Sequence, residues 1–217
     1  MPPIDAAMVA AEYVLTPTAG ITADSPAFAP TGVLELGGKV RAAHLRVLSR
    51  ILTHHLGEGG LARIKTERPE LGNALSATLS PLGWIDLSEL VASLTCARQL
   101  IPNGLVARKV GRGTMSATFA RMFGADPSTL PAETVLAALP TFWERYHDWG
   151  NVEVVVHPGA ADITMSGYSG SVDVCALVGA ELERIVELTG ANAVGATHVQ
   201  CRCTGGTTCE FRLSWMP

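Results

Sequence analysis

Residues 151–190 read NVEVVVHPGAADITMSGYSGSVDVCALVGAELERIVELTG, and this stretch decides the fold. Val152–Val156 and Ala161–Tyr168 are runs with a period of two, joined by a Pro-Gly turn, so they predict two antiparallel strands. Ser171 then precedes a run whose apolar residues recur at helical spacing as far as Gly190. This pattern predicts a long helix with a serine cap at its start and a glycine at its end.

The sequence on either side of this stretch completes the expected architecture. Downstream, Asn192–Cys203 and Cys209–Met216 flank a Thr/Gly-rich turn and are predicted to form a terminal hairpin. Upstream the period is helical, with helices expected over Lys39–Leu56 (stopped by Gly57), Asp86–Leu100, Leu105–Phe123 (loosened at Gly111 and Gly113) and Ala132–Trp149 (broken at Pro140). The predicted class is α+β, a helical bundle packed on a C-terminal antiparallel sheet with one long helix.

The domain organisation follows from composition along the chain. Residues 1–34 are rich in Ala and Pro and predict an N-terminal arm. Residues 35–217 are expected to form a single α+β domain, which the resemblance described below implies to be of ligand-binding type. Its helical part covers 35–150, and its sheet, long helix and cysteine cluster cover 151–217.

Overall composition narrows the classes of function. Of 217 residues, 47% are hydrophobic and 17% are charged, which is typical of a folded globular chain. The net charge is −4 and there is no cationic run, which argues against nucleic acid as a partner. No apolar stretch approaches the roughly 20 residues of a membrane span, and the N-terminus lacks a positively charged signal region. We therefore expect a cytoplasmic protein whose thiols stay reduced.

The cysteines gather at the C-terminal end. Cys175 lies near the start of the long helix, and Cys201, Cys203 and Cys209 lie around the terminal hairpin. Three of these thiolates and the imidazole of His198 would suit a structural zinc site. On a regular strand His198 and Cys201 face opposite sides, so both can bind one ion only if a bulge or a strand end falls between them. A set with Cys203 in place of His198 stays open, as does a cluster of buried thiols without metal.

The cluster resembles that of the 4-vinyl reductase type of small-molecule binding domain, found in bacterial sensors of phenols and other aromatic compounds. The intervals of 26 residues from Cys175 to Cys201 and 8 from Cys201 to Cys209 agree with that family. The resemblance implies one Zn²⁺ held by Cys175, His198, Cys201 and Cys209, with the histidine in place of an acidic ligand. The closing strand Cys209–Trp215 also fits, whereas Gly206-Thr stands where the family commonly has Gly-Asp.

A wider resemblance links the chain to a family of uncharacterised myxobacterial proteins of similar length. It rests on the Leu56-Gly-Glu-Gly-Gly60, Trp84-Ile-Asp86, Gly111-Arg-Gly113, Phe142–Gly150 and Val174-Cys-Ala-Leu-Val-Gly179 segments and on the Cys…Cys…Trp ending. It implies the fold shared by nitric-oxide-sensing haem domains, 4-vinyl reductase domains and small TRAPP subunits of Golgi transport. That fold is commonly dimeric, so a homodimer is expected. Fold alone does not specify activity.

Haem is the rival cofactor that this fold suggests. The chain has His44, His54 and His55 in the first predicted helix and His147 after an aromatic one. The Tyr-x-Ser-x-Arg signature of the haem sensors is missing, because Tyr168-Ser-Gly-Ser171 does not supply it. The sequence therefore argues against haem.

Aromatic residues of the helical part suggest a ligand pocket between bundle and sheet, although ordinary core packing would use the same residues. The candidates are Trp84, Phe119, Phe123, Phe142 and Tyr146. No nucleophile–base arrangement or acid/base pair stands out, so we expect no enzyme. The sequence favours a zinc-stabilised sensor or binding module with a hydrophobic pocket for a small apolar or aromatic ligand, signalling through an unknown protein partner. The alternative is a dimeric interaction scaffold without a small ligand.

Overall fold

A computed structural model describes residues 37–68, 71, 75, 80–101, 105–124, 126–167 and 171–216, except the side chain of Pro127. All of them belong to one compact unit, Thr31–Pro217. The predicted arm, residues 1–34, lies outside the described residues, and so do residues 168–170 of the absent haem-sensor signature. None of the described helices is long and apolar enough to cross a bilayer.

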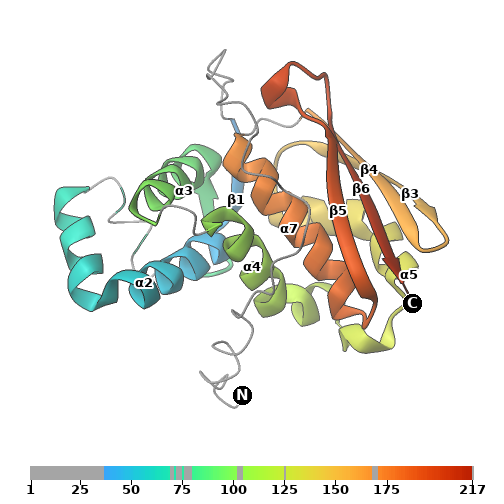
Figure 1. Ribbon diagram of the computed structural model, residues 1–217, viewed down its shortest axis with the longest axis horizontal. Coiled ribbons are helices and arrows are strands. Elements are labelled where there is room, and N and C mark those ends of the chain that lie inside the picture. Colours follow the sequence, from blue (N-terminus) through green and yellow to red (C-terminus); the bar gives the residue numbers. More distant parts are fainter. Residues whose placement is uncertain are drawn as a thin grey trace. The chain divides into compact units, whose positions relative to one another are not determined.

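The C-terminal part is a four-stranded antiparallel sheet with one long helix on it, as predicted (Figure 1). The strands run in the order β3 (Asn151–His157), β4 (Ala160–Ser166), β6 (Cys209–Met216), β5 (Asn192–Gln200). The helix is α7 (Val172–Leu188), and the Ser171 hydroxyl accepts a 3.3 Å hydrogen bond from the Val174 N–H at its start. The predicted serine cap is therefore confirmed.

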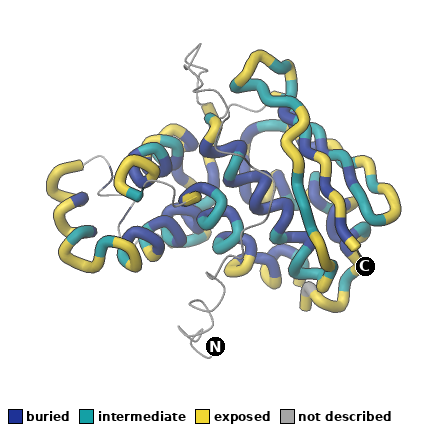
Figure 2. The backbone as a smooth tube through the Cα atoms, viewed as in Figure 1, coloured by how far each residue is buried: buried dark blue, intermediate teal, exposed yellow. Residues whose placement is uncertain are grey.

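Helix α7 lies between the sheet and the helices within residues 43–123, and Figure 2 shows it as a largely buried element. Strand β6 alternates buried and outward residues, and its buried set is Cys209, Phe211, Leu213 and Trp215. Gly179 of α7 lies over the Phe211 ring, and a Cβ at this position would stand at ordinary van der Waals contact, 3.4 Å from the ring. Because side chains alternate along a strand, every second residue of β6 points to the same face of the sheet, and α7 packs on that face.

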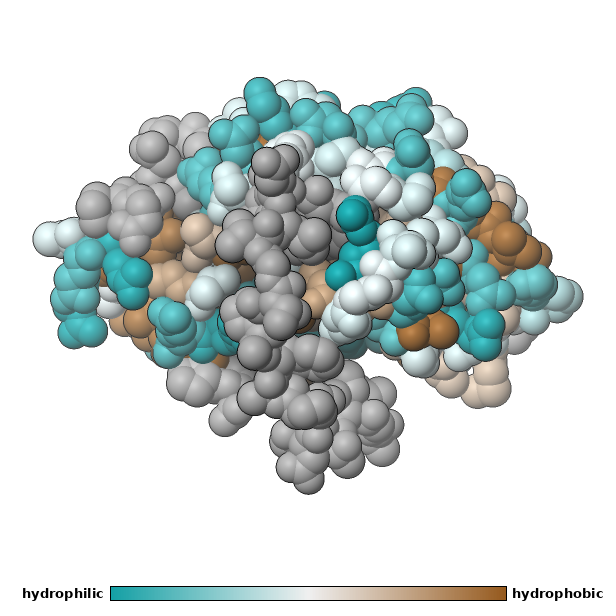
Figure 3. Space-filling view, turned by 90° about the horizontal axis from the view of Figure 1, so that it is seen from above, coloured by the Kyte–Doolittle hydropathy of each residue, from teal (hydrophilic) through white to brown (hydrophobic). Residues whose placement is uncertain are grey.

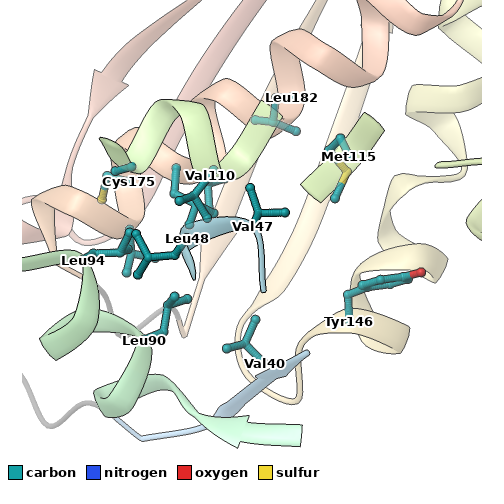
Figure 4. Packing of buried hydrophobic residues seen from close by; sticks show 14 of the residues in the cluster. Val40, Val47, Leu48, Leu90, Leu94, Val110, Met115, Tyr146, Cys175 and Leu182 are labelled. Atoms are coloured by element: carbon teal, nitrogen blue, oxygen red, sulfur yellow. The ribbon is translucent and has the colours of Figure 1, made fainter. Parts of the chain in front are cut away.

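The other helices form the predicted bundle beside α7. They are α2 (Ala43–Glu67), α3 (Leu87–Leu100), α4 (Val106–Phe123), α5 (Ala132–Ala137) and α6 (Leu139–Tyr146), with short 3₁₀ turns η2 (Pro127–Thr129) and η3 (Arg202–Thr204). Figure 4 shows Leu48 of α2, Leu94 of α3 and Val110 of α4 packed together next to α7, and each is buried. Burial of such side chains contributes about 1.5–3 kcal/mol each to folding.

Both predicted boundaries of the first helix were wrong. Lys39–Arg41 forms strand β1, which pairs antiparallel with β2 (Trp84–Asp86), so the first helix starts only at Ala43. Gly57 does leave helical geometry, with φ +67°, but the chain resumes the helix and ends it at Glu67. A glycine with positive φ kinks this helix where the sequence indicated a stop.

The third predicted helix is not loosened at its glycines, because α4 runs unbroken from Val106 to Phe123. Gly111 instead faces α7, where a Cβ would stand 2.3 Å from the Leu177 carbonyl oxygen. The glycine therefore allows the two helix backbones to approach. The predicted break near Pro140 is confirmed, since α5 ends at Ala137 and Pro140 lies in the first turn of α6, where its missing N–H costs no hydrogen bond.

Candidate metal centre

The four side chains implied by the resemblance meet at the N-terminal end of α7. One ligand atom each from Cys175, His198, Cys201 and Cys209 lies within 4.8 Å of the other three. Cys175 comes from the first turn of α7, His198 from the end of β5, Cys201 from the residue directly after β5, and Cys209 from the start of β6. Cys175 and Cys209 are buried, whereas His198 is exposed. The chain therefore brings helix and hairpin together at a group of metal-ligand atoms.

The sulfur spacing fits a tetrahedral ion. Cys175 Sγ lies 3.8 Å from Cys201 Sγ and 3.9 Å from Cys209 Sγ. Two thiolates bound to zinc at about 2.3 Å stand roughly 3.8 Å apart in a tetrahedron. A disulfide would need about 2.05 Å. The observed separations match this tetrahedral spacing, so the cluster could hold a metal such as zinc.

An irregularity in β5 resolves the geometric objection to His198. The register of β5 against β6 shifts between His198 and Gln200, and β5 ends at Gln200. Both the bulge and the strand end fall between His198 and Cys201, so the two side chains can face one point. The His198 ring also stacks on its cross-strand neighbour Phe211, with centroids 4.3 Å apart and planes within 4°. This stacking fixes the imidazole orientation.

The turn after β5 holds Cys201 in place. The Cys201 carbonyl accepts backbone hydrogen bonds from Thr204 at 3.1 Å and from Gly206 at 2.9 Å. A Cβ on Gly206 would stand 2.9 Å from that same carbonyl oxygen, so the tight turn requires glycine. The Arg202 N–H points at Cys209 Sγ at 3.4 Å. A backbone donor aimed at a sulfur stabilises its thiolate and orients it as a ligand.

Proton affinities in the cluster are strongly unequal. Hydrogen bonds to Cys203 and Cys209, followed by burial, raise the pKa of Cys175. The hydrogen bond from the Cys175 thiol lowers the pKa of Cys209 to about 4. Burial raises the pKa of Cys201 to about 11. Without a cation, the buried sulfurs must share protons because adjacent thiolates repel. A divalent ion would replace those protons and satisfy every sulfur together.

Cys203 is the remaining member of the predicted alternatives. Its Sγ lies 4.0 Å from Cys175 Sγ, and the hydrogen bond from Cys175 lowers the pKa of Cys203 to about 7. It is nevertheless not in the set of four mutually close ligand atoms, in which His198 stands. The geometry thus favours His198 as the fourth ligand and places Cys203 beside the site.

Among the described residues, the predicted aromatic side chains do not all line the cavity between α4, α6 and α7. A cavity of about 20 Å³ lies among α4, α6 and α7 and is lined by Phe142 and Tyr146 of the predicted set. Phe119 and Phe123 stack on each other at 4.3 Å, and Phe123 contacts Phe142 at 4.0 Å. Trp84 lies elsewhere, 41% exposed on β2 with the Arg41 guanidinium over its ring. These rings therefore mostly pack against one another.

A buried pair of a histidine and a carboxylate beside this cavity was not predicted. Glu181 of α7 is 3% exposed and bonds His44 Nε2 of α2 at 2.7 Å. The sequence does carry a signal for it, because Glu181 falls three or four residues after the apolar Leu177 and Val178 and thus on the buried face of the helix. An acidic residue in an apolar stripe indicates a buried partner.

No protein-family model matches the chain, and no curated protein does. Solved structures of H-NOX domains are similar in fold. An H-NOX protein from S. oneidensis in the Fe(II)NO state is 14% identical with TM-score 0.56, covering 82% of this chain and 99% of that one. A mutant H-NOX protein from K. algicida, Fe(II) and unliganded, is 10% identical with TM-score 0.59, covering 82% and 97%. An oxygen-binding H-NOX domain related to soluble guanylate cyclases is 12% identical with TM-score 0.55, covering 81% and 92%.

These likenesses establish an H-NOX-like α+β fold, and the residues here do not fit a haem. The cavity of about 20 Å³ is far below the roughly 300 Å³ at which small-molecule pockets begin. His44 is held by Glu181 and by the Arg41 carbonyl. His54 and His55 lie on an exposed part of α2. Among the described residues the cavity is too small for a haem, and His147, the buried imidazole in its lining, is stacked on Trp143.

Proposed function

We propose that this chain is a binding or sensor module, without catalytic activity, whose helical and sheet layers are joined by a structural zinc ion. The proposal rests on one observation, the convergence of Cys175, His198, Cys201 and Cys209 at tetrahedral spacing. Four protein ligands leave no open position on zinc, so the ion would stabilise rather than react. The H-NOX-like fold of known gas-binding domains supports a binding role over a catalytic one.

Any small ligand would be apolar and would enter between α4, α6 and α7. The cavity there has a mainly apolar lining that includes Met115, Phe142 and Leu182. At about 20 Å³ it holds roughly one water-sized molecule. An aromatic ligand would therefore have to displace side chains, with α6 as the shortest and most easily moved of these helices. We accordingly place the small-ligand role second to the zinc-clamped binding module.

The scaffold alternative depends on exposed surface. Large exposed hydrophobic residues among the described ones come from separate elements: Leu82, Trp84, Leu100, Leu105, Val155, Val172, Val199 and Met216. The face in Figure 3 accordingly shows its hydrophobic residues in separate groups between hydrophilic ones. Stable homodimers usually bury a continuous apolar area, so this surface favours a weaker partner contact.

Elemental analysis of the purified full chain tests the zinc assignment. We expect about one tightly held zinc per chain. Cys201→Ser should lose this zinc, and its free energy of unfolding should fall by several kcal/mol. Cys96→Ala is the matched control, because Cys96 is buried on α3 and outside the cluster, so it should keep the zinc. A Cys201→Ser protein with unchanged zinc content and unchanged melting temperature would refute the proposal.

A further inference from the structure

A second group of metal-ligand atoms lies in the core, on elements far apart in sequence. His44 of α2, His147 after α6 and Glu181 of α7 are 0%, 5% and 3% exposed. One ligand atom from each lies within 4.8 Å of the other two. Burying ionisable groups costs several kcal/mol unless they are paired. His44 and Glu181 pair with each other, and His147 lies beside them.

The hydrogen bonding of His44 fixes which of its nitrogens is free to bind. His44 Nδ1 lies 2.9 Å from the Arg41 carbonyl oxygen, which can only accept, so Nδ1 carries the proton. In the neutral ring, Nε2 then presents a lone pair toward Glu181 Oε1 at 2.7 Å. Two acceptors face each other, and a positive species must lie between them. That species is either a proton or a metal ion.

His147 adds a third possible ligand atom to this group. Its ring stacks on Trp143 with centroids 3.7 Å apart, and Trp149 packs edge-on at 5.3 Å. His147 Nδ1 is buried and has no hydrogen-bond partner among the described residues. The backbone around it is tied to β1, since the Asp148 N–H bonds the Lys39 carbonyl at 3.1 Å. The imidazole is therefore held in position with a nitrogen left over.

The donor set and its spacing suit a divalent transition metal. Two imidazoles and one carboxylate are typical ligands of Fe(II), Co(II) and Zn(II) in protein sites that keep open positions. Neighbouring ligands bound at about 2.1 Å in an octahedral site stand roughly 3.0 Å apart, close to the His44–Glu181 separation of 2.7 Å. The backbone carbonyl bonded to His44 Nδ1 is the outer partner that metal-bound histidines usually have.

The cavity adjoins this group. Its lining includes His147 and Glu181, and most of its other wall residues are apolar, among them Met115, Phe142 and Leu182. Its volume of about 20 Å³ accommodates roughly one water or a similarly small neutral molecule. An ion held by three protein atoms would thus have room for an exogenous ligand on one side.

We propose that His44, His147 and Glu181 form a second metal site, for a divalent first-row transition ion with a coordination position open to the apolar cavity. This site is independent of the cysteine cluster in its ligands and its chemistry. It would make the core able to bind a small neutral ligand without the large pocket that an organic cofactor needs.

Cobalt(II) is the probe, because its thiolate and nitrogen/oxygen sites absorb differently. We expect about two Co²⁺ per full-length chain, one with a thiolate charge-transfer band and one without. Glu181→Gln and His147→Gln should each lose only the ion without that band. Tyr146→Phe, which alters the same cavity wall but no ligand, should keep both.

Two outcomes would overturn the second site: a single thiolate-bound ion in the wild type, or two ions in Glu181→Gln. The first would leave a proton shared between His44 and Glu181. Should the variants fail to fold, proton NMR of cobalt-loaded wild type and His198→Ala decides, since a bound His44 must give a hyperfine-shifted, exchangeable Nδ1–H signal that remains when His198 is replaced. One ion without a thiolate band would refute the zinc clamp and leave the second site intact.

Discussion

Gly111 of α4 lies against the backbone of Leu177 on α7, so closely that a Cβ on Gly111 would stand 2.3 Å from the Leu177 carbonyl oxygen. The obstacle is backbone and cannot rotate away. We predict that Gly111→Ala lowers the free energy of unfolding by about 1–3 kcal/mol, because the clash outweighs the gain in helix propensity of about 1 kcal/mol. Urea denaturation measures the change.

The matched control for that substitution is Gly59→Ala in α2. Gly59 is helical and exposed, and a Cβ there would meet nothing within 4 Å. This variant should be neutral or stabilised by about 0.5–1 kcal/mol. Equal effects in both variants would show that helix propensity, and not the approach of α4 to α7, governs position 111.

The choice between His198 and Cys203 as fourth zinc ligand can be decided by two substitutions. We predict that His198→Ala weakens zinc retention against a competing chelator by at least about tenfold, whereas Cys203→Ser leaves it nearly unchanged. The reason is that the His198 atom belongs to the four mutually close ones and Cys203 Sγ does not. The reverse ranking would assign Cys203 to the ion.

Phe211 is expected to support His198 through the ring stack. Phe211→Leu keeps an apolar residue on the buried face of β6 but removes the aromatic surface 4.3 Å from the imidazole. We predict a lower zinc affinity than wild type at an otherwise full metal content in excess zinc. Chelator competition measures it, with Leu213→Ile, two residues further along the same face, as the control. Equal affinities in both variants would exclude the stack as a positioning device.

Glu183 joins three elements and should matter more than an exposed acid. It accepts hydrogen bonds from Arg108 of α4 at 2.5 Å and from the Ala196 N–H of β5 at 3.3 Å. Glu183→Gln should destabilise the protein by about 1–3 kcal/mol, because a largely buried charged bond is lost. Denaturation of Glu67→Gln provides the comparison.

Glu67 pairs with Arg63 on the surface of α2, with both side chains more than half exposed. Such a pair contributes about 0–1 kcal/mol. We therefore expect Glu67→Gln to be close to wild type. If it proved as destabilised as Glu183→Gln, the position of Glu183 between α4, α7 and β5 would not explain its contribution to stability.

Regular elements could be predicted from sequence because their signals are local. The Ser171 cap and the glycine after α4 mark helix ends by their own chemistry. Strand β1 could not be predicted this way, since three residues carry no periodicity and its existence depends on pairing with Trp84–Asp86. The continuation of the helix beyond Gly57 could not be predicted either, because tertiary packing decides whether a helix resumes after a kink.

The two candidate sites also differ in whether their signals are local in the sequence. The cysteine cluster could be predicted from residue types and spacing, and the bulge that lets His198 join it was stated only as a condition. That bulge depends on the register of β5 against β6, which sequence alone does not determine. His44 and Glu181 are 137 positions apart, so their contact could not be read from spacing, although the burial of Glu181 could.

Cys175 and Glu181 stand on the same helix, six residues apart, or roughly 9 Å along its axis. Because α7 is a rigid helix that carries one candidate ligand of each ion, a tilt that moves one ligand also moves the other. Occupancy of the core position and occupancy of the thiolate position should therefore be thermodynamically linked, each changing the affinity of the other by the same factor. In such a protein the concentration of available metal would itself change the affinity of the core cavity for a small ligand.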